Sequence, residues 1–566
     1  MGLKRQRRLP GGLQPGGAAV VLALALTGGW MISKGLRGPE KPSSLTSVPA
    51  SPGASADLAP TTMPVQGGSG VFRSDAPDAT ESATGSQCSG CDVVLVTVCS
   101  LRKDHVGVYG EIDIETPHMD RVAREGMRFG AAYSASNFTL ASLTAVLTGR
   151  FGSTTGVTGW DKGLTSEVPT LPEVLGVYGY KTGGFTTDAP SGFRPDYGLD
   201  RGFQHMEITS PPPGTPDGRG VGGAEAPLGA VVQPAARWLA GQTSDAPVFL
   251  MLHTRTAHFP FVVDATGADE DETGITRLLF TAGRTDDAVR PEDQAMPGMA
   301  GGTQQQGIVA IQGPDPLQVQ VNEVGAPAVT VWKQRYREAV ERMDADMGAL
   351  WKALEARGRL DKTVLVVVAD HGESLNDHGE LLHGDAFYDG VINVPLMIRI
   401  PGMKANAESS ALVSQVDILP TVLDLVGAVV PSGVDGQSMV GLLDGSAQTI
   451  RSATLSEGGV ARQDGPDMPG AVIAPPWSLL KQRRGCGTGR MVMDGEIPVC
   501  LYNQIDDPAQ DSSVASSHPE VVRALMQRWN GFREARAGAG RQLDLSPAFV
   551  EALQQTGYDF STGVPQ

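Results

Sequence analysis

The chain has 566 residues, a formal net charge of -18 at pH 7 and an isoelectric point near 5.0. A chain of this length holds about two to four domains of ordinary size and easily buries a core. Its acidic balance argues against a general nucleic-acid-binding protein, and we expect no nucleic-acid partner.

Residues 1–34 have the layout of an export signal. A basic start at residues 4–8 precedes an apolar stretch from Ala18 to Ile32, as in a signal peptide or a short signal anchor. The stretch is short for a membrane span and no clear Ala-x-Ala cleavage site follows it. Cleavage and a single N-terminal membrane anchor therefore both remain open. The positive-inside rule predicts that the rest is exported, either anchored to the membrane or in a periplasmic or extracellular location.

Strand and helix signals alternate along the globular body, which follows a linker. Residues 35–90 are rich in Pro, Ser, Gly, Ala and Thr, which predicts a disordered tether. The expected strands are 93–98, Tyr180–Thr186, Val248–His253, Val364–Val368 and Pro395–Ile400, and the expected helices are Met119–Gly126, Leu140–Leu147, Leu171–Tyr178 and Trp332–Arg357. This alternation predicts an α/β fold over residues 91–452, with a doubly wound, mostly parallel sheet and helices on both faces.

Two regions interrupt the alternation. Residues 263–328 are rich in Gly, Asp, Gln and Pro, which indicates an insertion. From residue 453 to 540 the pattern weakens, and we expect a smaller C-terminal α+β subdomain that includes a helix near Pro519–Phe532. Residues 541–566 are expected to form a tail.

The five cysteines fit an exported protein. Cys486 and Cys500 flank a short segment and can close a small disulfide loop in an oxidising compartment. Cys88 and Cys91 form a Cys-Ser-Gly-Cys pair, which we interpret as a local disulfide or a mobile thiol pair. The second cysteine pair that a zinc ribbon needs is absent.

A run of valines ends abruptly in Asp370 and His371, within the stretch VVVADHGES. Such an apolar run is typical of a strand buried on both faces of a parallel sheet. Open α/β sheets place their ligands at the carboxyl ends of such strands. Aspartate and histidine together suit a borderline divalent metal such as zinc, although a simple loop cap would also explain the pair.

Three distant segments carry polar groups at strand ends or helix starts: DVVLVTVCSLRKDHVGVYG, SNFTLASLTAVLTGR and VVVADHGESLNDHGELLHG. Further matches are TPHMDRVAREGMRF, HTRTAHFPF, YDGVINVPLMIRIPG and VDILPTVLDLVGAVVPSGVDGQSM. In this order, over Asp92 to Phe532, the set resembles the sulfatase branch of the alkaline phosphatase superfamily.

The resemblance implies an α/β core that holds a divalent metal at the carboxyl edge of the sheet, where a nucleophile attacks the sulfur or phosphorus of an ester. It places Asp370 and His371 on metal-ligand positions and His258 on the histidine that contacts substrate oxygens. His383 falls near the position of a Lys or His that faces the transferred group, and His378 is its neighbour. A hydrogen-bonded structural role remains the alternative for each of these three histidines.

The nucleophile segment departs from the family pattern. Sulfatases carry Cys-x-Pro-x-Arg, whose first residue becomes formylglycine, whereas this chain reads Thr-Leu-Ala-Ser-Leu from Thr139. Threonine cannot become that aldehyde, so we expect no formylglycine. Elsewhere in that superfamily, phosphoethanolamine transferases and nucleotide phosphodiesterases use a threonine nucleophile, so the resemblance still implies Thr139 as a candidate nucleophile. The alternative is that Thr139 only caps the following helix.

The first metal-binding segment departs as well. Where relatives have an aspartate ligand, this chain has Cys99. A cysteine thiolate can bind zinc but cannot replace a carboxylate for calcium or magnesium, so zinc is favoured if Cys99 is a ligand. Cys99 is otherwise an inert buried thiol. Arg102 and Asp104 keep the family pattern and are expected to form a structural ion pair, whereas Asn393 replaces a common arginine.

Three functions fit these residues. The first is a metal-dependent hydrolase of sulfate or phosphate esters with Thr139 as nucleophile. The second is a catalytically impaired pseudoenzyme that serves in binding or as a scaffold. The third is a phospho-group transferase on envelope substrates, which ranks last because such enzymes usually have several transmembrane helices.

Overall fold

The computed structural model describes residues 88–543, apart from 111, 113, 188–191, 210–227, 243–245, 259–325, 385, 459–467, 484, 488–496, 535–537 and 539. The expected export signal, nearly all of the linker and residues 544–566 of the tail lie outside the described residues. So does the expected insertion, except for its last three residues, which begin a helix.

An eight-stranded sheet forms the centre of the described chain, in the strand order β11-β2-β10-β7-β1-β6-β4-β5. Only β10 runs antiparallel to its neighbours, so the expectation of a mostly parallel sheet is confirmed. The strands are β1 (Asp92–Val98), β2 (Met127–Tyr133), β4 (Lys181–Thr187), β5 (His205–Thr209), β6 (Val248–Thr254), β7 (Thr363–Ala369), β10 (Leu396–Arg399) and β11 (Ala407–Ser414).

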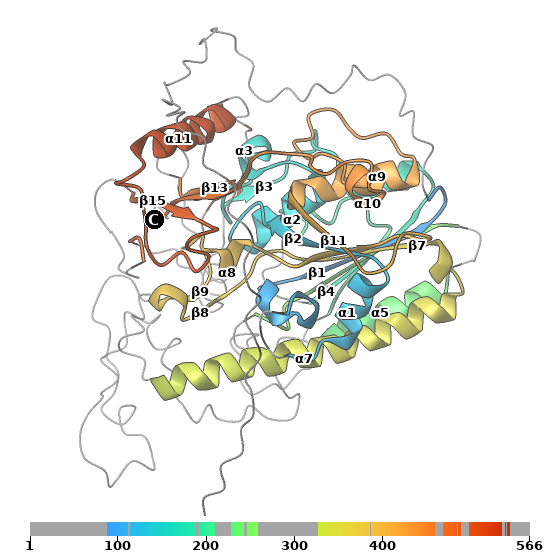
Figure 1. The fold of residues 1–566 in the computed structure, drawn as a ribbon. Coiled ribbons are helices and arrows are strands. Elements are labelled where there is room, and N and C mark those ends of the chain that lie inside the picture. The colour runs from blue at the N-terminus through green and yellow to red at the C-terminus, as the bar shows by residue number, and fades with distance from the viewer. Residues whose placement is uncertain are drawn as a thin grey trace, which may run out of the picture. The chain divides into compact units, whose positions relative to one another are not determined.

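Helices cover both faces of this sheet (Figure 1). One layer contains α1 (Pro117–Arg124), α5 (Leu228–Ala240) and the long α7 (Ala326–Arg357). The opposite layer contains α2 (Thr139–Thr148), α9 (Ile418–Val426) and α10 (Val440–Leu443). The remaining helices are α3 (Gly152–Thr155), α4 (Leu171–Val177), α8 (Asp389–Ile392) and α11 (Pro519–Glu534).

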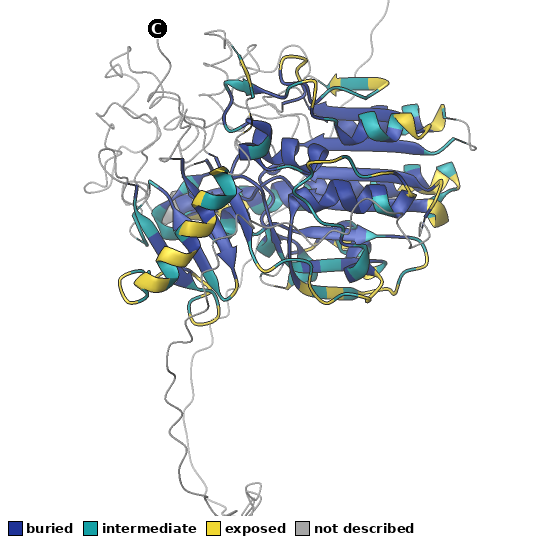
Figure 2. Ribbon diagram, turned by 90° about the horizontal axis from the view of Figure 1, so that it is seen from above, coloured by how far each residue is buried: buried dark blue, intermediate teal, exposed yellow. Residues whose placement is uncertain are grey.

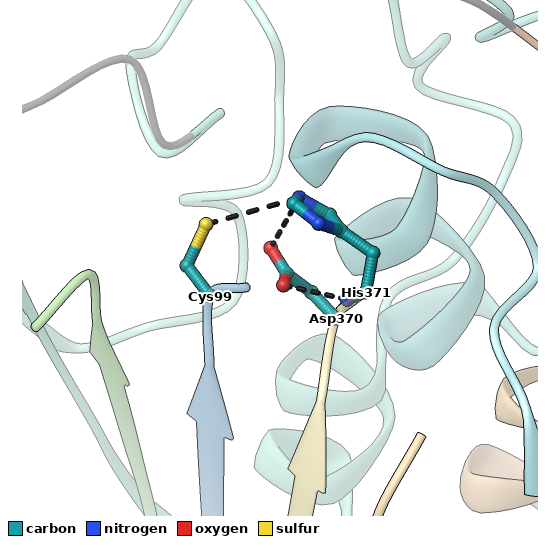
Figure 3. A group of neighbouring side chains, drawn as sticks. All are labelled: Cys99, Asp370 and His371. Atoms are coloured by element: carbon teal, nitrogen blue, oxygen red, sulfur yellow. Dashed lines mark hydrogen bonds and ion pairs between the residues drawn. The ribbon is translucent and has the colours of Figure 1, made fainter. Parts of the chain in front are cut away.

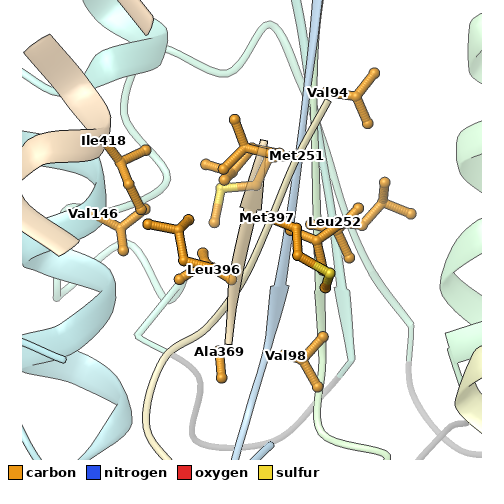
Figure 4. Packing of buried hydrophobic residues seen from close by; sticks show 14 of the residues in the cluster. Val94, Val98, Val146, Met251, Leu252, Ala369, Leu396, Met397 and Ile418 are labelled. Atoms are coloured by element: carbon orange, nitrogen blue, oxygen red, sulfur yellow. The ribbon is translucent and has the colours of Figure 1, made fainter. Parts of the chain in front are cut away.

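The central strands are buried along their whole length, as Figure 2 shows in dark blue. Val94 and Val98 of β1 lie on one side of the sheet with Leu252 of β6, and Met251 lies on the other side, toward Val146 and Ile418 of the helices (Figure 4). Because both faces of these strands are covered by helices, nearly every position requires an apolar side chain. This explains the uninterrupted valine runs in the sequence.

The C-terminal segment forms a four-stranded antiparallel sheet with α11 against it. Its strands are β12 (Thr454–Glu457), β13 (Gly470–Ala474), β14 (Trp477–Lys481) and β15 (Val499–Asn503). Leu525 and Trp529 of α11 are buried against this sheet. A disulfide joins Cys486 to Cys500 and another joins Cys88 to Cys91, which confirms both expected local pairings.

Four short strands form two pairs that connect loops. Strand β16 (Arg541–Gln542), at the start of the expected tail, pairs with β3 (Lys162–Gly163), and β8 (Ser374–Leu375) pairs with β9 (Leu381–Leu382). Within the described residues, no helix is both long enough and apolar enough to cross a bilayer.

A buried ion pair holds the amino end of β1. Asp92 accepts from Arg357 Nε at 2.7 Å and from Arg359 Nε at 3.2 Å, and the side chains of Asp92 and Arg357 are 1% and 4% exposed. Removing one partner of a buried pair leaves an uncompensated charge, which costs about 3–5 kcal/mol. We expect Asp92→Ala to lower the free energy of unfolding by this amount in chemical denaturation.

The pair between Arg128 and Glu408 is a matched control because it is equally short, at 2.6 Å, but its carboxylate side chain is 57% exposed. We expect Glu408→Ala to change stability by less than about 1 kcal/mol. Equal effects of the two substitutions would contradict the role assigned to burial.

Candidate active site and metal centre

Strands β1 and β7 deliver the first two site residues to the same point. The strands are parallel neighbours in a register that pairs Val98 with Ala369. Cys99 therefore follows β1 beside Asp370, which follows β7, and Asp370 N donates to Val98 O at 3.0 Å. Figure 3 shows the two side chains leaving these adjacent strand ends on the same side, with His371 beside them.

Asp370 is fully buried, and backbone groups hold only one of its oxygens. Oδ1 accepts from Ser100 N at 3.1 Å and from His371 N at 2.7 Å. Oδ2 has no hydrogen-bond donor and lies 3.7 Å from His371 Nε2. A buried carboxylate oxygen without a partner is costly, so this atom is positioned for a cation.

His371 presents a nitrogen lone pair to the centre. Its Nδ1 lies 2.8 Å from the carbonyl oxygen of Gly372, which can only accept, so Nδ1 carries the proton and Nε2 does not. Nε2 faces Thr139 Oγ1 at 3.3 Å and Cys99 Sγ at 3.8 Å. Burial lowers the pKa of His371 to about 4, although Asp370 opposes this shift, so the ring is neutral near pH 7.

Thr139 does not cap its helix, and the capping interpretation is wrong. It is the first residue of α2, Phe138 occupies the N-cap position, and no side chain caps this helix end. The Thr139 hydroxyl instead lies 3.2 Å from Cys99 Sγ. The side chain is directed into the centre because α2 begins against the carboxyl edge of the sheet.

Cys99, Asp370 and His371 form the one group of three or more potential ligand residues found in the described part of the chain. Their ligand atoms lie within 4.8 Å of one another, and all three residues are buried. The orphaned oxygen of Asp370 and the lone pair of His371 face the same point as the thiol. These residues therefore fit a divalent metal ion.

Two further sequence-predicted histidines lie beside this group. The His383 ring centroid is 4.1 Å from that of His371 and 5.0 Å from that of His258, and both residues are buried. His378 is not part of the cluster. It stacks on Tyr388 at 3.7 Å and its Nδ1 lies 3.8 Å from Asp511.

Glu373 has a contact that the sequence analysis missed. Its Oε1 lies 3.1 Å from His383 Nδ1, so the Glu373 side chain orients that ring. Burial raises the pKa of Glu373 to about 8 and lowers the pKa of His383 to about 3. Glu373 belongs to the same Asp-His-Gly-Glu stretch as the candidate metal ligands Asp370 and His371, and that position is the signal that could have identified it.

Arg255 was missed as well. Its Nη2 lies 2.8 Å from His258 Nε2 and 3.0 Å from Nδ1, and the whole side chain is buried. Burial is the main cause of the low pKa values of His383 and His253, and the positive charge of Arg255 lowers them further. A buried guanidinium beside the histidines makes this side of the centre suitable for an anion.

Arg102 and Asp104 form the expected ion pair next to the centre. Arg102 Nε donates to Asp104 Oδ1 at 2.9 Å, and the guanidinium also bonds to Asp377. These charges line a cavity of about 580 Å³ together with His378 and Asn393. None of the metal-ligand candidates lines this cavity.

Residues 92–428 match the family model described as Sulfatase. An N-acetylglucosamine-6-O-sulfatase of Bacteroides thetaiotaomicron is 26% identical over 396 residues, which cover 60% of this chain and 68% of that protein. The arylsulfatase K of Bos taurus is 29% identical over 199 residues. That match covers 33% of this chain and also 33% of the relative, so the chain spans about a third of that protein.

Solved structures share the fold at low sequence identity. A protein solved in complex with its substrate D-glucosamine-2-N,6-O-disulfate aligns with a TM-score of 0.57 at 20% identity, over 79% of this chain and 98% of the other. The phosphonate monoester hydrolase of Agrobacterium radiobacter aligns with a TM-score of 0.57 at 19% identity, over 79% and 96% of the two chains. These likenesses support an alkaline phosphatase-like α/β fold.

The converging donor atoms lead to a prediction about metal content. We expect the purified protein to bind about one zinc ion per chain, and Asp370→Ala to weaken binding by more than about 100-fold because it removes the orphaned carboxylate. Elemental analysis and competition with a chromogenic chelator measure this. Asp361→Ala, at an exposed position before β7, is the control and should bind zinc normally. Stoichiometric zinc in Asp370→Ala would contradict the assignment.

Proposed function

Because this chain belongs to the sulfatase family, we propose that it is a metal-dependent hydrolase of sulfate or phosphate esters in which Thr139 is the nucleophile. One observation carries the proposal. The Thr139 hydroxyl, at the first position of α2, lies within 3.3 Å of both Cys99 Sγ and His371 Nε2. A hydroxyl used only for packing or capping would not be expected among the donor atoms of a metal centre.

Cys99, Asp370 and His371 are the residues that would hold the metal. A thiolate, a carboxylate and an imidazole together favour zinc over calcium or magnesium, which prefer all-oxygen ligands. A bound divalent cation supplies positive charge that neutralises ester oxygens and favours deprotonation of a nearby hydroxyl. This centre uses no formylglycine.

Thr139 would form the new bond. Its Oγ1 attacks the sulfur or phosphorus, the bond to the alcohol oxygen breaks, and water later releases sulfate or phosphate from the threonine ester. Because His371 Nε2 would be occupied as a metal ligand, the hydroxyl proton would leave to water, and a bound cation would favour that loss. The amino end of α2 directs backbone N–H groups and a positive partial charge toward the developing anion.

His383, Glu373 and the pair Arg255–His258 would serve the substrate. Glu373 lies against Nδ1 of His383, so Nε2 of that ring is the atom that would exchange a proton with the leaving oxygen. Arg255 and His258 place donors for the non-bridging oxygens of the ester. Their burial strengthens these contacts because water does not screen them.

The substrate is proposed to be a sulfate ester or a phosphate ester. The similar proteins include an N-acetylglucosamine-6-O-sulfatase and a phosphonate monoester hydrolase, which are named for a sulfate ester and a phosphonate ester. The buried guanidinium supports an anionic group without distinguishing sulfur from phosphorus. Export, with or without an N-terminal anchor, remains a proposal that rests on residues 1–34.

A pseudoenzyme is the second candidate, and Cys99 favours it. This residue takes the place of a carboxylate ligand, and without metal its thiol is a buried group packed against Thr139. A chain that retained the fold for binding could tolerate this change. An ester hydrolase could tolerate it only with a thiophilic metal.

Removal of the Thr139 hydroxyl tests whether the protein is a hydrolase that uses this residue as its nucleophile. We expect Thr139→Val to lower kcat of the zinc-loaded protein by at least roughly 1,000-fold, because loss of a nucleophile removes the covalent route, and Thr139→Ser to retain turnover. Hydrolysis of aryl sulfate and aryl phosphate esters measures this.

Thr144→Val is the matched control, since this hydroxyl on the same helix bonds to Leu140 O and should leave turnover unchanged. If the zinc-loaded chain hydrolyses neither ester and Cys99→Asp restores no activity, the proposed hydrolase function is wrong and the pseudoenzyme function is favoured.

A further inference from the structure

The turn after β1 has an unusual backbone. Ser100 adopts φ 60°, in the left-handed region that a residue with a side chain rarely adopts. The residue is fully buried, so neither solvent nor a flexible loop accounts for the conformation. Backbone strain of this kind persists only where surrounding contacts impose it.

This turn sets two features of the metal centre. It follows Cys99 directly, so its path fixes where the thiol points. It also directs Ser100 N to Asp370 Oδ1 at 3.1 Å, which leaves Oδ2 as the oxygen without a donor. A relaxed Ser100 would turn this N–H away and release the carboxylate to rotate.

Tyr336 of helix α7 bridges the turn. Its hydroxyl donates to Ser100 O at 2.7 Å and accepts from Arg102 N at 2.8 Å. One hydroxyl therefore connects the peptide groups on either side of Leu101, from a helix more than 200 residues away in sequence. Burial raises the pKa of Tyr336 well above its ordinary value, so the hydroxyl keeps the proton that it donates.

We propose that Tyr336 is a positioning residue for the metal centre, holding Ser100 in its left-handed conformation so that Cys99 and Asp370 meet at one ion. This inference rests on the metal centre of the proposed function. It assigns to the long helix α7 a task beyond covering the sheet. The hydroxyl acts through Ser100 and touches neither the ion nor the substrate.

Tyr336→Phe removes the hydroxyl and leaves the ring. We expect zinc affinity to fall about 10- to 100-fold, as is typical when a partner behind the ligands is lost. We also expect the thiolate-to-cobalt charge-transfer band of the cobalt-substituted protein to weaken, because that band reports the Cys99–metal bond. Tyr109→Phe is the matched control. The Tyr109 hydroxyl also bridges a backbone N–H and a carbonyl, both of Leu396 and both at 3.0 Å, and its loss should change neither readout.

A second substitution separates positioning from general packing. Glycine adopts a positive φ without strain, so Ser100→Gly should restore zinc affinity and the cobalt band in the Tyr336→Phe background. A packing defect in α7 would not be repaired by a change at residue 100. If the wild type and Tyr336→Phe bind metal equally, or if Ser100→Gly restores neither zinc affinity nor the cobalt band, the role of Tyr336 is wrong but the proposed metal centre is unaffected. If the wild type binds no metal, the inference and the metal centre of the proposed function both fail.

Discussion

The parallel register between β1 and β7 determines whether this protein has a site. Each strand ends one residue before a side chain of the centre, and the pairing of Val98 with Ala369 brings Cys99 and Asp370 into adjacent positions. Strand side chains alternate between faces, so a slip of one residue would send one of these groups to the opposite side of the sheet. Both strands are wholly buried. Any other register would expose some of their apolar side chains, and that cost favours the observed pairing.

The central part of the sheet could be predicted from the sequence, and its periphery could not. Strands β1, β6 and β7 were recognised because helices cover both of their faces, which requires the apolar runs that the sequence shows. Strands β2 (MRFGAAY), β5 (HMEIT) and β11 (AESSALVS) were not among the expected strands, because Gly, Ala, Ser and charged residues dilute the pattern where a strand is partly exposed. The antiparallel direction of β10 depends on distant pairings that no local pattern encodes.

The same division applies to the site. Asp370 and His371 could be predicted because they follow directly from a strand end, and their chemistry is that of metal ligands. Thr139 was open to misinterpretation, since a hydroxyl at the start of a helix satisfies a local capping rule, and only the packing of α2 against the sheet directs it to Cys99. Tyr336 could not be predicted at all. Its role depends on one hydroxyl reaching a turn on another strand, and a buried tyrosine on a helix ordinarily indicates core packing.

Position 99 carries a thiol where the family resemblance implies a carboxylate, and this would change how stable the proposed centre is without metal. Two ionised carboxylates held this close in a buried place would repel each other strongly, so such a site depends on its cation. A thiol can retain its proton, and here it packs 3.2 Å from Thr139 Oγ1, which leaves Asp370 as the one carboxylate of the ligand group. Metal binding must then displace the thiol proton, which makes affinity fall as pH falls. In the proposed centre the cysteine would therefore reduce charge repulsion in the metal-free protein, favour zinc over calcium or magnesium, and couple metal binding to proton release.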